Sequence, residues 1–278
     1  MRLIDSHCHL QADRFDEDLD LVIGGARLAG VERILVPGWD VASGRRALEL
    51  VDRYPWLDAA VGVHPHDAEN VDDAGWTEIV ALAVDARVVA IGESGLDYDR
   101  MFAPVLGQLQ NLRRNLRLAA ETGKPAILHC RSAEGERDAQ DALLRELRTF
   151  GDRPPPVLVH SYSGPVDYAE AMLELGAFVS FSGLVFRRGE EASAQVARLA
   201  PAERLLVETD SPFLSPPGAP RRRNEPEWVA VIARWIAEVR GEDQEAVGEQ
   251  LVANYDRLVA GSRQPDLQTL PDAPSRAP

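Results

Sequence analysis

The chain of 278 residues is poor in cysteine and contains no long apolar run. Its two cysteines, Cys8 and Cys130, lie far apart in the sequence, each beside a histidine. This usage excludes a fold held by a disulfide framework and favours a reducing, cytoplasmic location. Because no apolar run could cross a bilayer, and His7 and His9 already follow the first apolar segment, we expect neither a membrane anchor nor a signal peptide.

Positive charge is also scarce. The chain has 30 Lys and Arg residues against 45 Asp and Glu residues, a net charge of −15, and Lys124 is its single lysine. The averaged field repels phosphate, which excludes nucleic-acid binding through the whole surface. Bound cations would reverse that sign locally. The one dense basic run, Arg221, Arg222 and Arg223, is either a solvated loop or a contact to a phosphate backbone.

Eight apolar segments rich in β-branched residues alternate with stretches of helical periodicity. We expect strands over residues 2–4, 33–36, 59–63, 88–92, 126–129, 157–161, 178–181 and 205–208. Near-continuous apolar strands are typical of a parallel sheet covered by helices. No glycine-rich phosphate-binding fingerprint follows the first segment, which argues against an open dinucleotide-binding sheet. The pattern therefore predicts an α/β fold, a closed (β/α)8 TIM barrel, which needs about 250 residues.

The helical stretches complete this architecture and bound the domain. We expect helices over residues 19–29, 108–122, 136–147, 168–175, 227–240 and 245–259. Gly123 and Gly241 stand directly after two of them, where a C-terminal cap is expected. The last residues are rich in Pro, Gln and Asp and have no periodicity. We therefore expect a single domain over residues 1–261 and a disordered tail over residues 262–278.

All six histidines lie at or just beyond the end of an apolar segment. In an extended backbone His7 and His9 point to the same side, so both imidazoles could hold one cation, although an accidental pair has the same spacing. Glu93 directly follows residues 88–92, where a buried carboxylate is costly unless it is paired or metal-bound. The alternative is a loop carboxylate hydrogen-bonded to a neighbouring strand.

Three further candidate ligands follow later segments. His129 and His160 end consecutive apolar segments, and Asp210 follows the last one. Either histidine alone could be structural, but the carboxyl ends of barrel strands meet at one face, where barrel enzymes place their sites. The complete set is His7, His9, Glu93, His129, His160 and Asp210. Four imidazoles and two carboxylates exceed the needs of one tetrahedral ion and suit two divalent cations with Glu93 between them. Mg, Mn, Zn and Co all fit such ligands.

The chain resembles the TatD family of metal-dependent deoxyribonucleases in these residues and in the motifs around them. The resemblance covers about the first 260 residues. Its motifs are residues 4–10 (IDSHCHL), 62–66 (GVHPH), 92–98 (GESGLDY), 129–131 (HCR), 160–164 (HSYSG), 208–214 (ETDSPFL), 223–226 (RNEP) and 254–258 (NYDRL).

The resemblance implies a barrel of the metallo-dependent hydrolase type that cleaves DNA phosphodiester bonds with a metal-activated water, as a 3′-5′ exonuclease on single-stranded DNA. By position, His7 and His9 correspond to ligands of a first metal, and Glu93 corresponds to the bridging ligand. His129 and His160 correspond to ligands of the second metal. Asp210 corresponds to a ligand of the first metal that also takes the proton of the water. We expect DNA ends as the partner, no membrane contact and a monomer.

Several residues near these ligands admit two interpretations. Arg131 is a candidate phosphate clamp or a structural ion pair. His64 and His66 either donate hydrogen bonds to phosphate or only build a turn. The sequence also departs from the family pattern at Ser94, where an aliphatic residue is usual, at Ser132, where Asp commonly follows the Arg, and at Ser161, where Cys is frequent. These positions bear on metal orientation and substrate preference.

Two other functions remain open from the sequence. Related barrels hydrolyse small-molecule amides, lactones or phosphoesters on similar binuclear sites. Their usual carboxylated lysine is absent, because Lys124 precedes the fifth apolar segment and Glu93 takes the bridging place. The other possibility is a non-catalytic barrel that binds nucleic acid or a protein, which the complete ligand set argues against.

Overall fold

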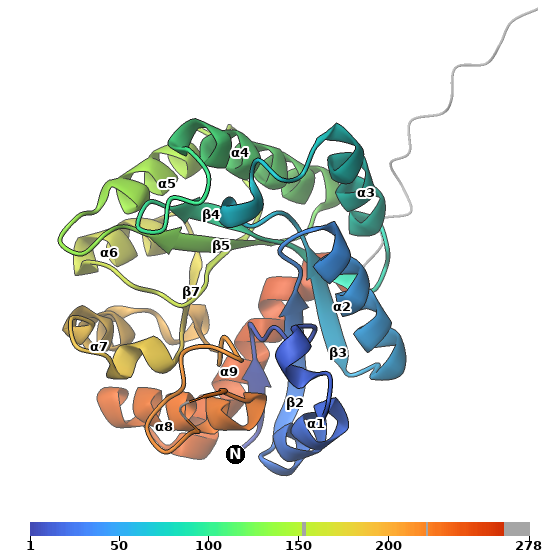
Figure 1. The fold of residues 1–278 in the computed structure, drawn as a ribbon. Helices are drawn as coiled ribbons and strands as arrows, with labels where there is room; N and C mark the ends of the chain where they lie inside the picture. The colour runs from blue at the N-terminus through green and yellow to red at the C-terminus, as the bar shows by residue number, and fades with distance from the viewer. Residues whose placement is uncertain (152–153, 221, 264–278) are drawn as a thin grey trace, which may run out of the picture.

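A barrel of eight parallel strands forms the centre of the molecule (Figure 1). The computed structural model describes residues 1–151, 154–220 and 222–263. The strands are β1 (Leu3–Asp5), β2 (Val31–Pro37), β3 (Leu57–Val61), β4 (Val88–Asp97), β5 (Ala126–Arg131), β6 (Val157–Val159), β7 (Phe178–Phe181) and β8 (Leu205–Val207). Each pairs with the next in chain order, and Ser6 N donates to Val207 O (3.0 Å) between the first and last strands. The predicted (β/α)8 barrel is confirmed.

Helices surround the barrel (Figure 1). They are α1 (Leu19–Leu28), α2 (Val41–Arg53), α3 (Asp73–Ala83), α4 (Val105–Thr122), α5 (Asp138–Arg148), α6 (Val166–Glu174), α7 (Glu191–Leu199), α8 (Val229–Arg240) and α9 (Gln244–Val259). As expected, Gly123 and Gly241 cap α4 and α8 in the left-handed conformation. Among residues 1–151, 154–220 and 222–263, no helix is both long and apolar enough to cross a membrane.

Strand β4 is longer than predicted. The expected end at Gly92 is wrong, because pairing with β5 resumes after a register shift and continues to Asp97 opposite Arg131. All ten residues of β4 are buried. Gly92 has φ +142°, and a Cβ there would lie 2.6 Å from Ile127 O, so only glycine lets the two strands approach. Glu93 therefore lies within β4 and not after it.

β7 ends where expected, at Phe181, and the other strands except β4 differ from expectation by one or two residues at their carboxyl ends. β1 continues to Asp5, one residue beyond the predicted end, whereas β3 and β6 stop two residues early, at Val61 and Val159. Because the sheet is parallel, the carboxyl ends of its strands lie together at one end of the barrel. We call this end, where all strands finish, the mouth of the barrel. Of the expected tail, residues 264–278 lie outside the described residues, as does Arg221.

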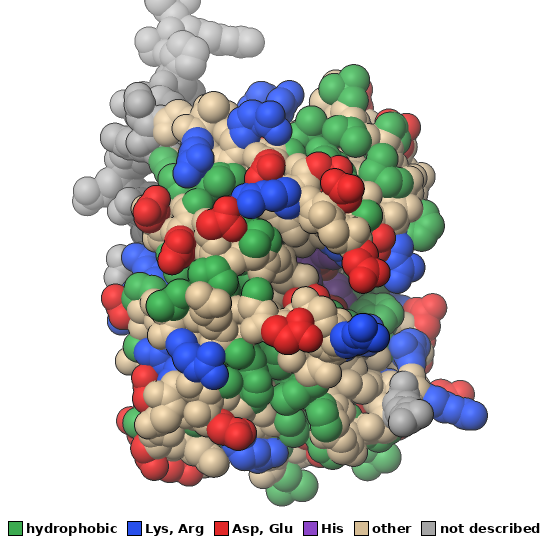
Figure 2. Space-filling model, turned by 90° about the vertical axis from the view of Figure 1, so that its left-hand side faces the viewer, with side chains coloured by type: hydrophobic (Ala, Val, Ile, Leu, Met, Phe, Trp, Pro, Cys, Tyr) green, Lys and Arg blue, Asp and Glu red, His purple; other side chains and the backbone are tan. Residues whose placement is uncertain are grey.

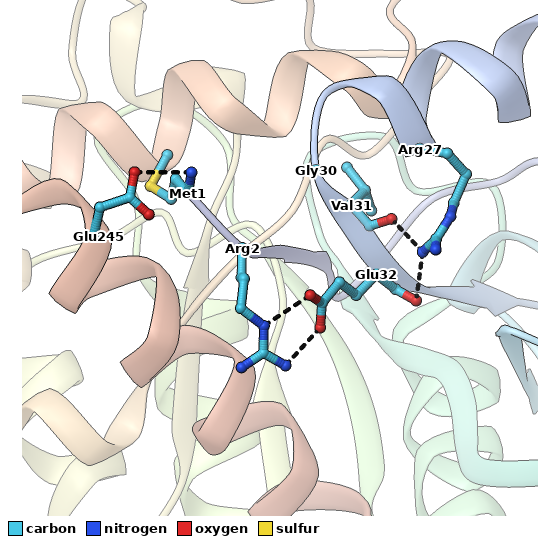
Figure 3. A pocket seen from close by; sticks show the side chains of 7 residues that line it. All are labelled: Met1, Arg2, Arg27, Gly30, Val31, Glu32 and Glu245. Atoms are coloured by element: carbon cyan, nitrogen blue, oxygen red, sulfur yellow. Dashed lines mark hydrogen bonds and ion pairs between the residues drawn. The ribbon is translucent and has the colours of Figure 1, made fainter.

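The opposite end of the barrel carries a surface pocket of about 310 Å³ (Figure 3). The Met1 ammonium lies 2.9 Å from Glu245 Oε1, and Arg2 makes a bidentate pair with Glu32 at 2.7 Å. Arg27 Nη1 donates to Val31 O at 2.9 Å. These contacts join α9, β1, β2 and α1. The pocket is lined by paired charges that hold the base of the barrel together.

Candidate metal centre

Glu93 lies at the centre of the mouth, with only 3% of its side chain exposed. Its Oε2 atom lies 3.2 Å from His7 Nε2 and 3.5 Å from His9 Nε2. The two Nε2 atoms are themselves 3.2 Å apart. The backbone that follows β1 therefore brings both imidazoles to one carboxylate oxygen, as the spacing of His7 and His9 predicted.

The other oxygen of Glu93 faces a second group of imidazoles. Oε1 lies 2.9 Å from His160 Nε2, 3.3 Å from His129 Nδ1 and 3.2 Å from His64 Nε2. His129 Nδ1 and His160 Nε2 are 3.3 Å apart. Each oxygen of one carboxylate thus has its own set of nitrogen atoms.

Asp210 closes the first group from the side of β8. Its Oδ1 atom lies 3.5 Å from His9 Nε2 and 3.8 Å from His7 Nε2. Asp210 N donates to His7 O at 2.9 Å, so the segments after β1 and β8 hold each other in place. The mouth therefore gathers all six predicted ligands.

The ionisation of the Glu93 carboxyl group depends on the surrounding imidazole rings. Burial alone would raise the pKa of this carboxyl group, but His160, His64 and His7 outweigh it and hold the pKa well below its usual range. Burial lowers the pKa of His7, and lowers that of His64 to about 4. Glu93 is therefore anionic and His64 neutral at pH 7.

The pKa values of other imidazoles in the cluster are raised and not lowered. Burial would lower the pKa of His160, but Glu93 and Glu208 raise it well above the usual value. The pKa values of His9 and His129 are also raised, because nearby carboxylates outweigh burial. The neighbouring carboxylates therefore favour positive charge at the positions of these three imidazole rings.

Outer partners orient two of these rings. Glu208 Oε1 lies 3.1 Å from His160 Nδ1, and Ser180 donates to the other oxygen of Glu208. Pro37 O lies 3.3 Å from His9 Nδ1. With Nδ1 bonded outward, each ring turns the lone pair of Nε2 into the cluster, as metal-binding histidines do. The donor set therefore fits divalent cations.

Asp97 is a site residue that the sequence analysis missed. Its Oδ2 atom lies 2.8 Å from His66 Nε2 and 3.2 Å from His129 Nε2. Burial would raise the pKa of Asp97, but His129 and His66 hold it well below the usual value. Asp97 follows Glu93 by four residues in β4, a spacing that puts both side chains on one strand face. That spacing in the sequence could have indicated Asp97 as a site residue.

The two remaining histidines lie inside this network. His66 N donates to His64 Nδ1 at 3.1 Å, so the neutral His64 ring carries its proton on Nε2 and donates it to Glu93. The segment after β3 also forms the turn that was the alternative interpretation, a short 3₁₀ helix over Pro65–Asp67. His66 is the more exposed ring.

Two of the predicted basic residues, Arg131 and Arg223, are held by carboxylates. Arg131 Nη2 lies 2.7 Å from Asp99 Oδ2, the ion pair of the structural interpretation, at a half-exposed position. Arg223 forms two 2.7 Å bonds to Asp18 and another to Glu225. Arg223 therefore fastens the loop after β8 to the start of α1.

The three departures from the family pattern surround the ligands. Ser94 is buried beside Glu93. Ser132 Oγ accepts from Ala139 N at 2.9 Å, so its hydroxyl serves the first turn of α5. Ser161 Oγ lies 2.6 Å from Ser182 Oγ, a bond between the segments after β6 and β7.

The cluster opens to solvent on one face of the molecule. Histidine side chains are visible at the bottom of a hollow there (Figure 2). His129 and Asp210 are partly exposed, whereas His7 and Glu93 are buried. A ligand can therefore reach the centre from the mouth.

Known proteins are similar to this chain in sequence. A TatD exonuclease of Cronobacter sakazakii, named as acting 3′-5′ on single-stranded DNA and RNA, is 37% identical over 269 residues, 95% of this chain and all of the relative. The metal-dependent hydrolase YabD of Bacillus subtilis is 34% identical over 92% of this chain and 98% of its own.

A solved structure is also similar to this chain in fold and sequence. That of YJJV, a TatD homologue of Escherichia coli, matches with a TM-score of 0.84 and 30% identity, covering 93% of this chain and 98% of that protein. The family described as TatD related DNase matches residues 4–260. Both the predicted family and the predicted class, a metal-dependent hydrolase, are confirmed. The chain belongs to the TatD family of DNases.

Proposed function

We propose that this protein removes nucleotides from the 3′ end of single-stranded DNA by metal-dependent hydrolysis of phosphodiester bonds. The observation that carries the proposal is the position of Glu93, whose two oxygens face separate groups of imidazole nitrogens. A carboxylate so placed can join two cations. The name of the Cronobacter sakazakii relative supports the polarity and the single-stranded substrate.

The donor atoms divide between two cation sites. His7, His9 and Asp210 would hold one ion, His129 and His160 the other, and Glu93 both. Two bound divalent cations would lower the pKa of a water molecule and offset the negative charge that develops on the phosphoryl oxygens.

Asp210 is the proposed proton acceptor. Burial would raise the pKa of its carboxyl group, but hydrogen bonding to His9 and the charges of His7 and His9 lower it. The carboxylate is therefore ionised at neutral pH, and it is partly exposed at the mouth. It can receive a proton from the attacking water.

Residues at the rim would position the phosphate. His64 is neutral, and a phosphoryl oxygen would compete with Glu93 for the proton on its Nε2, while His66 lies beside it. The guanidinium of Arg131 matches phosphate oxygens in the same bidentate way as it does a carboxylate, so a bound phosphate would compete with Asp99 for it.

The test uses chelated protein resupplied with Mg²⁺, Mn²⁺, Zn²⁺ or Co²⁺ one at a time. With a 5′-labelled single-stranded oligonucleotide, we expect a ladder that shortens from the 3′ end, dependent on the added ion and lost in Asp210→Asn. Internal cleavage, shortening from the 5′ end, or turnover of a lactone without DNA cleavage would contradict the proposal.

A further inference from the structure

Two phenylalanine rings project into solvent beside the metal centre. Phe102 is 67% exposed and Phe213 is 52% exposed, although an exposed aromatic ring forgoes the free energy of burial. Phe102 follows β4 and Phe213 follows β8. These strands lie half a turn apart in the ring of eight, so the two rings stand on opposite sides of the mouth.

Each ring contacts a different side of the cluster. The Phe213 ring is 6.1 Å from the ring of His9, whose Nε2 faces Oε2 of Glu93. The Phe102 ring is 4.7 Å, edge to face, from the ring of His66. His66 shares Asp97 with His129, which faces Oε1 of Glu93. The two rings therefore flank the carboxylate.

Both rings occupy defined positions. Phe213 N donates to Asp210 O at 2.8 Å, which ties the ring to the proposed proton acceptor. Phe102 precedes α4, whose first residues, Val105 and Leu106, are also exposed. Exposed aromatic rings beside a polar centre suit a ligand with flat apolar faces.

We infer that Phe102 and Phe213 are stacking platforms for the two nucleobases on either side of the scissile phosphodiester, an inference that rests on the proposed function. A phosphodiester at Glu93 has one nucleoside on each side. Only unpaired bases expose their faces to such rings, which selects single strands. Stacking also supplies affinity independent of positive charge, which a chain of net charge −15 needs.

The test is a double-mutant cycle between each ring and each base. The variants are Phe102→Ala and Phe213→Ala, and the oligonucleotides carry an abasic residue at either the 3′-terminal or the penultimate position. On the unmodified strand we expect each variant to lower kcat/KM by at least about tenfold, mainly through KM. Each ring should couple to one abasic position only. On the oligonucleotide that is abasic at that position, replacing the ring with Ala should lower kcat/KM by less than about twofold.

Matched variants separate stacking from other effects. Phe102→Tyr and Phe213→Tyr keep a flat face and should retain kcat/KM within about threefold. Leu28→Ala removes an apolar side chain that is 93% exposed at the other end of the barrel and should change nothing. Melting temperatures of all variants should match the parent protein, because both rings are exposed.

The outcomes distinguish this inference from the proposed function. If the parent protein cleaves from the 3′ end but the rings and bases act independently, or both rings couple to the same position, the stacking inference is wrong. If the parent protein does not cleave DNA, the proposed function has failed.

Discussion

At the scale of single residues, the centre depends on how each imidazole is oriented. His160 has its two nitrogens between two carboxylates, Glu93 inside and Glu208 outside. His129 has the same arrangement with Glu93 and Asp97. A ring held on both sides cannot turn its lone pair away from a cation.

The first prediction concerns Glu208→Gln. The change keeps the shape of the side chain but removes the charge that fixes the proton on His160 Nδ1. We expect Mn²⁺ affinity to fall about 10–100-fold, measured by titration of the chelated protein. Glu146→Gln, which breaks a pair with Arg113 on the outer helices, is the matched control. Equal affinity in the two variants would show that Glu208 does not orient the ligand.

The second prediction concerns pH. Carboxylates raise the pKa values of His129 and His160 above 6.5, so cation binding must expel protons from these rings. Affinity for Mn²⁺ should therefore fall as the pH is lowered from 8 to 6, by up to about tenfold per pH unit for each proton displaced. In the metal-free protein the same imidazolium–carboxylate contacts stabilise the fold at low pH and are lost as the pH rises through the raised pKa values. Calorimetry in buffers of different ionisation enthalpy measures the protons released, and a pH-independent affinity would contradict this assignment.

At the scale of elements, the strand ends determine which side chains meet. His7, His9 and Glu93 were found from the sequence because each follows an apolar segment, and such segments end where a barrel strand reaches the mouth. Asp97 was missed because Gly92 and Gly95 indicated the end of a strand. The strand β4 instead continues for five residues beyond Gly92. The close approach of β4 to β5 that requires these glycines is a tertiary contact, which local patterns do not report.

Helices were predicted less completely than strands. The sequence analysis did not delimit α2, α3 and α7. The start of α4 was placed three residues late, at residue 108, because the exposed Val105 and Leu106 begin it.

The third prediction concerns Gly92→Ala. The new Cβ would lie 2.6 Å from Ile127 O at a φ of +142°, so we expect a loss of more than about 2 kcal/mol in the free energy of unfolding and displacement of Glu93. Gly24→Ala, in the open middle of α1 with nothing within 4 Å of its Cβ, should instead gain up to about 1 kcal/mol. Urea denaturation compares the two, and equal stabilities would refute the close approach of β4 and β5.

At the scale of the whole molecule, strong negative charge surrounds a centre that needs cations. The net charge of −15 repels a polyanionic substrate, while bound divalent ions attract it at one place only. We therefore expect substrate recognition to be concentrated at the mouth. The paired state of Arg131 and Arg223 agrees with this distribution of charge.

The fourth prediction follows from that distribution. Raising NaCl from 50 to 200 mM should change the KM for a single-stranded oligonucleotide by less than about threefold. A protein with 6–10 phosphate contacts would lose about 10³–10⁵ in affinity over the same range. A steep salt dependence would mean that an extended basic surface, and not the metal centre, binds the strand.

The pairing of two cations through Glu93 is tested most directly by anomalous diffraction from a crystal soaked in Mn²⁺. We predict two peaks, one beside His7, His9 and Asp210 and the other beside His129 and His160, with the carboxylate of Glu93 between them. A single peak, or two peaks away from Glu93, would contradict the account.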